Sequence, residues 1–316
     1  MIFVKSEDLK YGMRLAKPIY NKTGVLLYER NTRLTLQGIE SVKNFGLLGL
    51  YILEPAEPVP PMTEEDLDFE RFQTMAVFSI REELDNIIAG REPVNLKRLA
   101  NAIITNYGRL DHKITFTQNL RSTTDYVYKH VINTAILCAL ISAQVYYTPT
   151  EQEELVLAAL LHDIGKLLLP NKVREKYDDY DTNDLIIVKK IQNDGLGLLR
   201  PEIGIDSGVR RIVAQIHRME YGNSNLEQGK ILKSTKILKV ANLFDTMTCM
   251  KISEEAISEI AAIKYLLLNK DEFDEEIVGA LIKSINILTP GVCIELTNRE
   301  KGLVTVSYTH LRAHET

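Results

Sequence analysis

The stretch LLHDIGKLLLP, residues 160–170, sets a histidine, an aspartate and a lysine within an otherwise apolar run. Burying ionisable side chains is costly unless they are paired or bound to a metal. On a helix, the adjacent His162 and Asp163 point about 100° apart, and Lys166 lies on the same face one turn later. An imidazole and a carboxylate can ligate one ion together, and a lysine beside it can hold a phosphate oxygen. The stretch predicts a helix with a metal-binding cluster; the alternative is an exposed pair that caps or solvates the helix.

A second histidine favours the metal interpretation. His130 lies in TDYVYKHVINTAILCALISAQV, residues 124–145, a strongly apolar run that predicts the central helix of a bundle. A lone histidine on an apolar face is most often a core residue whose polar atoms are satisfied. Its place one helix before the His-Asp pair instead indicates that His130 joins His162 and Asp163 as a ligand.

The first 53 residues predict a small β-rich module. Two short apolar runs flank residues 21–24, which is a hairpin signal, and LGLYIL at residues 48–53 predicts a further strand. A short helix is expected between them, around TLQGIESVKNFG. Residues 54–66 are rich in proline and acidic side chains, so they predict an extended linker.

From residue 67 to residue 304 the apolar period becomes helical, which predicts an all-α domain and a mainly α chain. Gly90 and Gly108 end its first two helices, and Thr150 with Glu153 stands in capping-box register before the LLHDIGKLLLP helix. The predicted helices occupy residues 66–90, 94–108, 124–145, 149–170, 208–219, 234–250, 253–269 and 274–288.

Composition excludes several classes of function. The net charge is −5, so the chain as a whole offers no basic surface to a nucleic acid polymer. No uninterrupted apolar run reaches the roughly 18 residues of a membrane span. Three cysteines without ligand spacing indicate reduced thiols and a cytoplasmic protein. The tail at residues 307–316 is typical of translated vector sequence and is expected to be non-native, so its histidines are set aside.

Five motifs follow one another in a recognisable order: YVYKHVINTAILCAL, LLHDIGKLLLP, IVKKIQNDGLGLL, IHRMEYGN and KILKVANLFDTMT. In this order they resemble the HD-GYP domain, a helical, metal-dependent phosphodiesterase module that hydrolyses cyclic di-GMP. The resemblance runs from about residue 119 to residue 304. The first hundred residues resemble a short module often fused in front of that domain in Gram-positive bacteria.

The resemblance implies roles for particular residues. His130, His162 and Asp163 stand where the family places its first ligands, and Lys166 matches the family's lysine. Asp163 and Lys166 are therefore expected to be catalytic, with Lys166 also binding substrate. The implied metal ligands are His130, His162, Asp163, His217 and Asn242, the last in place of an aspartate.

The chain also departs from the family pattern. Ile191 and Ile216 stand where the family has histidines, and Arg218 replaces an acidic residue. The Gly-Tyr-Pro motif, expected near residues 224–226, is absent. Isoleucine offers no ligand atom, and Arg218 adds positive charge that repels a cation. The resemblance therefore implies one divalent ion (iron, manganese or zinc-like) or none.

Three functions are compatible with this pattern. The first is a degenerate HD-GYP-like signalling protein with weak or no hydrolysis, which binds cyclic di-GMP, another nucleotide or a protein. The second is an active metal-dependent phosphodiesterase or phosphohydrolase with a reduced metal site. The third, a purely structural bundle, leaves the HDIGK motif unexplained. A protein partner is expected at the N-terminal module, and the chain is expected to form a homodimer.

Overall fold

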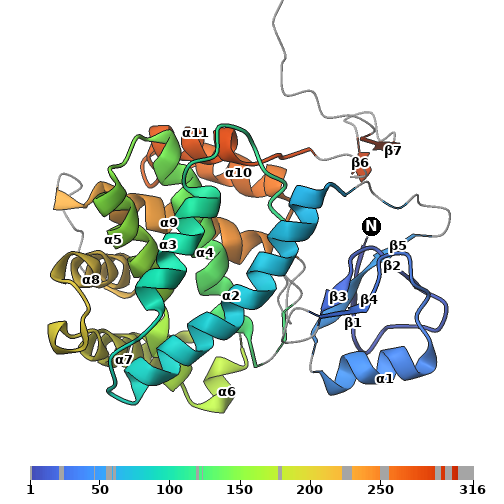
Figure 1. Ribbon diagram of the computed structural model, residues 1–316, viewed down its shortest axis with the longest axis horizontal. Coiled ribbons are helices and arrows are strands. Elements are labelled where there is room, and N and C mark those ends of the chain that lie inside the picture. Colours follow the sequence, from blue (N-terminus) through green and yellow to red (C-terminus); the bar gives the residue numbers. More distant parts are fainter. Residues whose placement is uncertain are drawn as a thin grey trace, which may run out of the picture.

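The computed structural model describes residues 2–20, 25–45, 47–54, 59, 62–118, 121–122, 124–176, 180–222, 230–249, 256–288, 293–295 and 301–304. Figure 1 shows a small N-terminal module of short strands and one helix beside a larger bundle of helices. This arrangement confirms the mainly α fold with a β-rich module in front. The tail that was expected to be non-native lies outside the described residues.

The N-terminal module is organised by a three-stranded antiparallel sheet in the order β1–β5–β2. Strand β1 (Ile2–Lys5) pairs along its whole length with β5 (Gly49–Leu53), and β2 (Arg14–Leu15) pairs with the far end of β5. Strand β5 is the segment LGLYIL that the sequence predicted. Because both of its neighbours pair with it, β5 is the central strand, and its residues are nearly all buried.

The predicted hairpin and helix complete the module. Strand β3 (Ile19–Tyr20) pairs antiparallel with β4 (Leu26–Tyr28), while the expected turn at residues 21–24 lies outside the described residues. Helix α1 (Leu36–Asn44) begins at Thr35, whose hydroxyl accepts a hydrogen bond from the Gly38 amide. The small core joins the sheet, the hairpin and this helix, and it consists of Leu9, Leu15, Ile19, Leu34, Ile39, Val42, Leu50 and Ile52.

The first long helix begins earlier than the sequence predicted. Helix α2 spans Glu64–Ile88, so the last three residues of the expected linker are helical. The reason is a capping box: the Thr63 hydroxyl accepts from the Asp66 amide while the Asp66 carboxylate accepts from the Thr63 amide. Helix α3 (Leu96–Tyr107) follows and ends at Gly108, as expected.

Helix α4 (Tyr126–Gln144) is the centre of the bundle, as predicted. It packs against α2, α3, α9, α11 and the following helix α5 (Pro149–Leu161). Its length and hydropathy are those of a membrane span, but 83% of the apolar window is buried inside the protein. A core helix surrounded by others needs apolar residues on all sides, which accounts for that composition.

The LLHDIGKLLLP stretch is not one helix, which corrects the sequence prediction. Helix α5 begins at Pro149 as expected, but its capping box is Thr148 with Glu151, two residues before the predicted Thr150 and Glu153, and Pro149 fits the first turn. It ends at Leu161. After His162 and Asp163 the chain tightens into a 3₁₀ segment, η1 (Ile164–Leu168).

The remaining helices surround this core, and a strand pair follows them. The sequence predicted an all-α domain to residue 304. Strands β6 (Cys293–Glu295) and β7 (Lys301–Leu303) instead pair antiparallel, so the end of this segment is not helical. The other helices are α6 (Asn171–Arg174), α7 (Thr182–Leu198), η2 (Pro201–Ile203), α8 (Ser207–Tyr221), α9 (Lys233–Thr248), α10 (Glu259–Leu268) and α11 (Glu275–Ser284).

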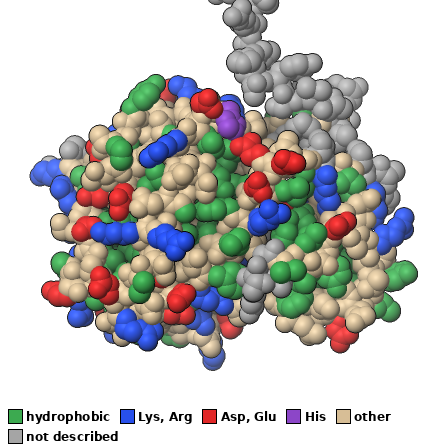
Figure 2. All heavy atoms as spheres, viewed as in Figure 1, with side chains coloured by type: hydrophobic (Ala, Val, Ile, Leu, Met, Phe, Trp, Pro, Cys, Tyr) green, Lys and Arg blue, Asp and Glu red, His purple; other side chains and the backbone are tan. Residues whose placement is uncertain are grey.

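The surface in Figure 2 carries acidic and basic side chains interspersed over both the bundle and the module. This mixture agrees with the small net charge of −5. Cys138 and Cys249 are buried free thiols, in line with the expectation of reduced cysteines.

Candidate metal centre

The break between α5 and η1 turns the His-Asp pair toward α4. His130 Nε2 lies 3.5 Å from Asp163 Oδ2, and His162 Nε2 lies 3.7 Å from the same oxygen. One ligand atom from each of these three residues lies within 4.8 Å of the others, and all three side chains are buried. The structure thus brings together His130, His162 and Asp163 from two segments that are 32 residues apart.

Hydrogen bonds fix the orientation of the two imidazoles. His162 Nδ1 lies 2.7 Å from the Ala159 carbonyl oxygen, and His130 Nδ1 lies 2.6 Å from Asp245 Oδ2. Because both partners are acceptors, each Nδ1 carries the proton and donates it. The Nε2 atoms of both rings face Asp163, and neither has a hydrogen-bond partner among the described residues. An outer partner on one nitrogen and a free lone pair on the other is the usual state of a metal-ligating histidine.

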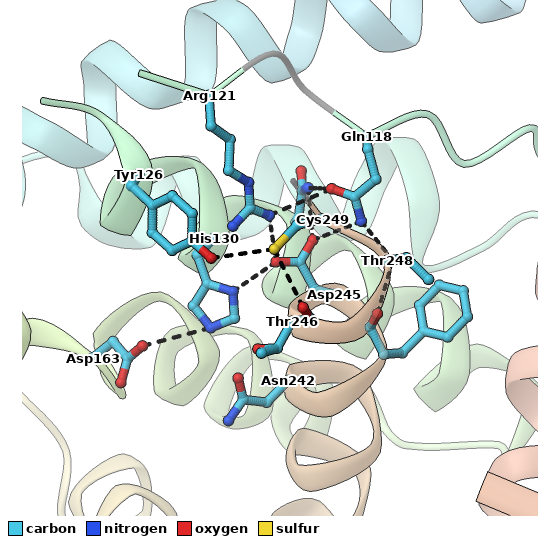
Figure 3. A network of polar contacts seen from close by, with 12 residues as sticks. Gln118, Arg121, Tyr126, His130, Asp163, Asn242, Asp245, Thr246, Thr248 and Cys249 are labelled. Atoms are coloured by element: carbon cyan, nitrogen blue, oxygen red, sulfur yellow. Dashed lines mark hydrogen bonds and ion pairs between the residues drawn. The ribbon is translucent and has the colours of Figure 1, made fainter. Parts of the chain in front are cut away.

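Asp245 is the hub that holds His130. Its Oδ2 accepts from His130 and from Arg121 Nη2 at 2.5 Å. Its Oδ1 accepts from Gln118 Nε2 at 3.0 Å and from Asn133 Nδ2 at 2.8 Å. Figure 3 shows these donors converging on the carboxylate from three sides. Burial by itself would raise the pKa of Asp245, but the Arg121 guanidinium and His130 outweigh it and hold that pKa well below its usual range.

Asp163 is held on both of its oxygens. Gln192 Nε2 donates to Oδ1 at 2.7 Å, and Lys166 Nζ lies 2.8 Å from Oδ2. Burial would raise the pKa of this carboxyl, yet Lys166, His162 and His130 outweigh it and keep the pKa far below its usual range. Burial also lowers the pKa of His162 to about 4. The cluster is therefore an ionised aspartate with a neutral His162 beside it.

Two glycines, Gly165 and Gly195, let α7 pack close enough to η1 for Gln192 to reach Asp163. A Cβ on Gly165 would lie 2.3 Å from Gln192 Oε1 and 2.7 Å from its Cα, and a Cβ on Gly195 would lie 2.6 Å from the Gly165 Cα. Real Cβ atoms do not approach other atoms so closely, so only glycine permits this contact. The glycine of HDIGK is therefore explained by backbone packing of η1 against α7.

Two of the predicted ligands do not join the cluster. His217 Nε2 donates to the His162 carbonyl oxygen at 2.5 Å, and burial lowers the pKa of this histidine. His217 thus supports the backbone of the His-Asp pair. Asn242 Nδ2 donates to Glu220 Oε1 at 2.5 Å, and Figure 3 shows its amide one turn away from Asp245, with no contact drawn to the cluster.

The two isoleucines at expected histidine positions pack with apolar neighbours. Ile216 is fully buried in the main core. Ile191 is half-buried in a small cluster with Leu169, Val173 and Val188. The neighbouring Gln192, not Ile191, reaches Asp163. The region of the expected Gly-Tyr-Pro motif, residues 224–226, lies outside the described residues.

Three polar residues that build the site were not among the predicted site residues. Asp245 lies in the FDTMT part of a quoted motif, so its acidic side chain in an apolar helix was an available signal. Gln192 stands beside a predicted ligand position and carried no signal of its own. Arg121, a fully buried cation in a segment without periodicity, becomes visible only when its partner Asp245 is placed.

The three ligands fit one divalent ion. Two imidazole nitrogens and a carboxylate oxygen are a donor set that zinc and iron accept. The unpartnered His130 Nε2 and His162 Nε2 are the buried acceptors that such an ion would satisfy. The hollow beside them, lined by residues including Tyr126, Lys166 and Tyr180, has a volume of only about 10 Å³. That is room for roughly one water-sized group.

Comparison with known proteins identifies the family. A profile of the HD domain matches residues 95–277, which include all three ligands. The chain belongs to the HD domain family. Within the family, a solved HDG"Y"P protein from Bdellovibrio bacteriovorus, Bd1817, superposes with a TM-score of 0.50 at 16% identity, over 89% of this chain and 97% of that chain. At this identity the likeness shows a shared fold.

Three relatives carry the name cyclic di-GMP phosphodiesterase. PA4108 of Pseudomonas aeruginosa is 22% identical over 188 residues, or 58% of this chain and 45% of the relative. The response regulator RpfG of Xanthomonas campestris is 26% identical over 152 residues, or 46% and 40%. PdeB of Borreliella burgdorferi is 23% identical over 184 residues, or 56% and 47%. The chain spans less than half the length of each of these relatives.

Proposed function

We propose that this chain is a degenerate HD-GYP-like signalling protein that binds cyclic di-GMP or another nucleotide and hydrolyses it weakly or not at all. Its kinship with three cyclic di-GMP phosphodiesterases supports the nucleotide. The observation that carries the loss of activity is the state of Asp163. Its two carboxylate oxygens are engaged by Gln192 and Lys166 of the same chain.

A bridging carboxylate needs both oxygens for metal ions. In two-metal phosphodiesterases the ions lie about 3.5–4 Å apart and divide the attacking and leaving oxygens between them. The Gln192 amide donates to Asp163 Oδ1, so this oxygen is already engaged within the chain. Ile191 and Ile216 offer no ligand atom in its place. The proposal is therefore one ion or none, ligated by His130, His162 and Asp163.

The second candidate is a metal-dependent phosphodiesterase or phosphohydrolase that works with this reduced site. The buried lone pairs of His130 and His162 favour it, because they have no hydrogen-bond partner. A divalent ion bound there would polarise a phosphoryl oxygen as a Lewis acid. In this function Lys166 would release Asp163 and hold a phosphate oxygen of the substrate.

The proposal covers the rest of the chain as well. Residues 1–53 form a module that is open to a protein partner, and the linker shortens to residues 54–62 because α2 begins at Glu64. The protein works in the cytoplasm, as a homodimer, and does not bind nucleic acid polymers.

Metal content and turnover of the purified protein test the proposal. We expect at most one ion per chain by elemental analysis after incubation with Mn²⁺ or Fe²⁺. We also expect chromatography to resolve little or no product from cyclic di-GMP. Two ions per chain together with rapid hydrolysis would remove the signalling proposal and leave the enzyme.

A triple variant tests the account of the lost ligands. Ile191→His, Arg218→Glu and Asn242→Asp together restore charge and ligand atoms, so bound metal per chain should rise. Ile216 is left unchanged because its side chain packs in the main core. A folded triple variant whose metal content equals that of the parent would contradict the assignment of these positions.

A further inference from the structure

A large cleft lies where the N-terminal module meets the helical bundle. Its volume is about 690 Å³, within the range of roughly 300–1,000 Å³ that is usual for small-molecule sites. The module contributes Lys17, Tyr20 and Phe45 to its wall, and helix α2 contributes Glu70, Phe78 and Arg81. The segment that leads into α4 closes the remaining side.

Several charged side chains that line this cleft are buried and have few or no hydrogen-bond partners among the described residues. Glu70 is only 9% exposed, and its Oε2 has no hydrogen-bond partner among the described residues. Arg81 Nε is likewise buried and unpartnered, while the guanidinium lies over the Tyr128 ring. Lys17 Nζ makes a long contact of 3.4 Å to the Gln118 carbonyl oxygen and stacks on Tyr51. Buried polar atoms of this kind are rare in folded proteins unless a ligand or water completes them.

The wall matches the two halves of a nucleotide. Three cations line the cleft and can pair with a phosphate, namely Lys17, Arg81 and Lys129. Of these, Lys129 also forms an ion pair with Asp125, with its Nζ 2.7 Å from Oδ2. The charged lining is thus three cations against two acids, Glu70 and Asp125, so the cleft carries one more basic than acidic side chain. Phe45 and Phe78 add aromatic faces on which a base can stack.

We propose that this junction cleft, rather than the hollow beside the metal cluster, is the nucleotide-binding site of the chain. The proposal rests on the nucleotide-binding function proposed above and gives it a location. The volumes decide between the two places: about 690 Å³ at the junction against about 10 Å³ beside His130 and Asp163. Of these two places, the junction cleft is the one with room for a phosphate, a sugar and a base.

Hydrogen bonds connect two residues that line the cleft to the metal cluster. Gln118 and Gln73 both line the cleft. Gln118 donates to Asp245, and Gln73 donates to Asn133 at 2.9 Å, which in turn donates to Asp245. Asp245 holds the ligand His130. A nucleotide that shifts Gln118 therefore changes the support of a metal ligand without touching the metal.

Titration calorimetry with cyclic di-GMP and with GMP tests the location. Lys17→Met and Arg81→Met should each weaken binding about tenfold or more, since a charge-assisted hydrogen bond contributes roughly 1.5–3 kcal/mol. Lys10→Met in the module and Arg98→Met on α3 remove exposed cations outside the cleft and should leave affinity unchanged.

The Glu70→Gln substitution changes a charge in the cleft and should leave folding intact, so it tests binding alone. It keeps the shape of the side chain while it removes residual negative charge, so affinity should hold or rise severalfold. Asp163→Asn, in the metal cluster, should change affinity far less than Lys17→Met or Arg81→Met does. If Asp163→Asn abolishes binding while the cleft variants bind like the parent, the cleft is wrong and nucleotide binding stands. If the parent binds neither cyclic di-GMP nor GMP, nucleotide binding itself fails.

Discussion

Asp163 is the residue at which metal binding and ion pairing compete. Lys166 Nζ sits 2.8 Å from the oxygen that faces the two histidines. A metal ion at that oxygen would place a dication beside an ammonium group in a buried site, where charges interact more strongly than in water. We infer that Lys166 supplies the positive charge that an ion would otherwise bring to this oxygen.

Replacing that lysine should tighten metal binding. Without the ammonium of Lys166, the buried carboxylate of Asp163 lacks a cation, and Mn²⁺ can supply one. We expect Lys166→Met to bind Mn²⁺ about tenfold more tightly, or ~1.4 kcal/mol, by calorimetry. Lys172→Met on α6, an exposed lysine close in sequence, serves as control. Weaker Mn²⁺ binding by Lys166→Met would show that the lysine supports the ion.

Asp245 gives a second prediction at this scale. Asp245→Asn leaves the buried Arg121 without a counter-charge, and breaking a buried pair costs about 3–5 kcal/mol. Chemical denaturation should show this loss, whereas the exposed Asp194→Asn should stay within about 0.5 kcal/mol of the parent. Adding Arg121→Met to Asp245→Asn should restore part of the stability. A double variant less stable than Asp245→Asn would count against the ion pair as the cause.

Individual residues were predictable where a motif carried them. His130, His162, Asp163 and Lys166 stand in quoted motifs, and the structure gathers them. His217 was expected at the cluster from its motif, but only the structure shows that its ring bonds to a carbonyl. Which atom a side chain reaches depends on packing between distant segments, and that is absent from local sequence.

At the scale of elements, η1 and α7 are joined by backbone contact. Gly165 and Gly195 bring the two segments so close that no side chain fits between them. This contact places Gln192 on Asp163. Local patterns predicted that α5 and the LLHDIGKLLLP stretch were helical, but not that the helix would end at Leu161. The break depends on α7 packing against η1, a tertiary effect.

Two glycine-to-alanine substitutions distinguish the cost of filling the close η1–α7 contact from the gain in helix propensity that alanine brings. Gly165→Ala adds a methyl group where α7 lies, so it should cost about 1–3 kcal/mol. Gly197→Ala on α7 meets nothing within 4 Å and should stabilise the protein by about 0.5–1 kcal/mol. Thermal or denaturant unfolding measures both. Equal effects of the two substitutions would refute the close approach.

At the scale of the molecule, the module and the bundle share a buried acid. Glu70 projects from α2 into the junction beside Lys17. Composition and hydrophobic period were sufficient to predict both bodies and the fold class. The cleft between them was not predictable, because its lining residues come from four separate segments and none forms a motif.

The acid makes stability depend on pH in a defined direction. Burial raises the pKa of Glu70 above its ordinary value of 4.5. Between that value and the raised pKa, the folded protein keeps a proton that the unfolded chain releases, so stability falls as pH rises through this window. A Glu70→Gln variant has no carboxyl group at this position to titrate, so it does not lose stability in this pH window. Its stability relative to the parent should therefore be greater at about pH 8 than at about pH 5.

Denaturant unfolding at both pH values measures the difference. The exposed Glu82→Gln on the same helix is the control and should show no such dependence. A Glu70→Gln variant that loses stability relative to the parent as pH rises would mean that Glu70 works as a charged partner of Lys17.

The central position of α4 also has a kinetic consequence. Amide protons in a helix enclosed on nearly all sides exchange with solvent only when the whole domain opens. His130 is therefore attached to the slowest-opening part of the protein. His162 and Asp163 instead adjoin η1, a short 3₁₀ segment, whose backbone hydrogen bonds have poorer geometry than those of an α-helix. We expect faster deuterium uptake in η1 than in α4, so an ion held between them would escape by local opening on the η1 side while α4 stays folded.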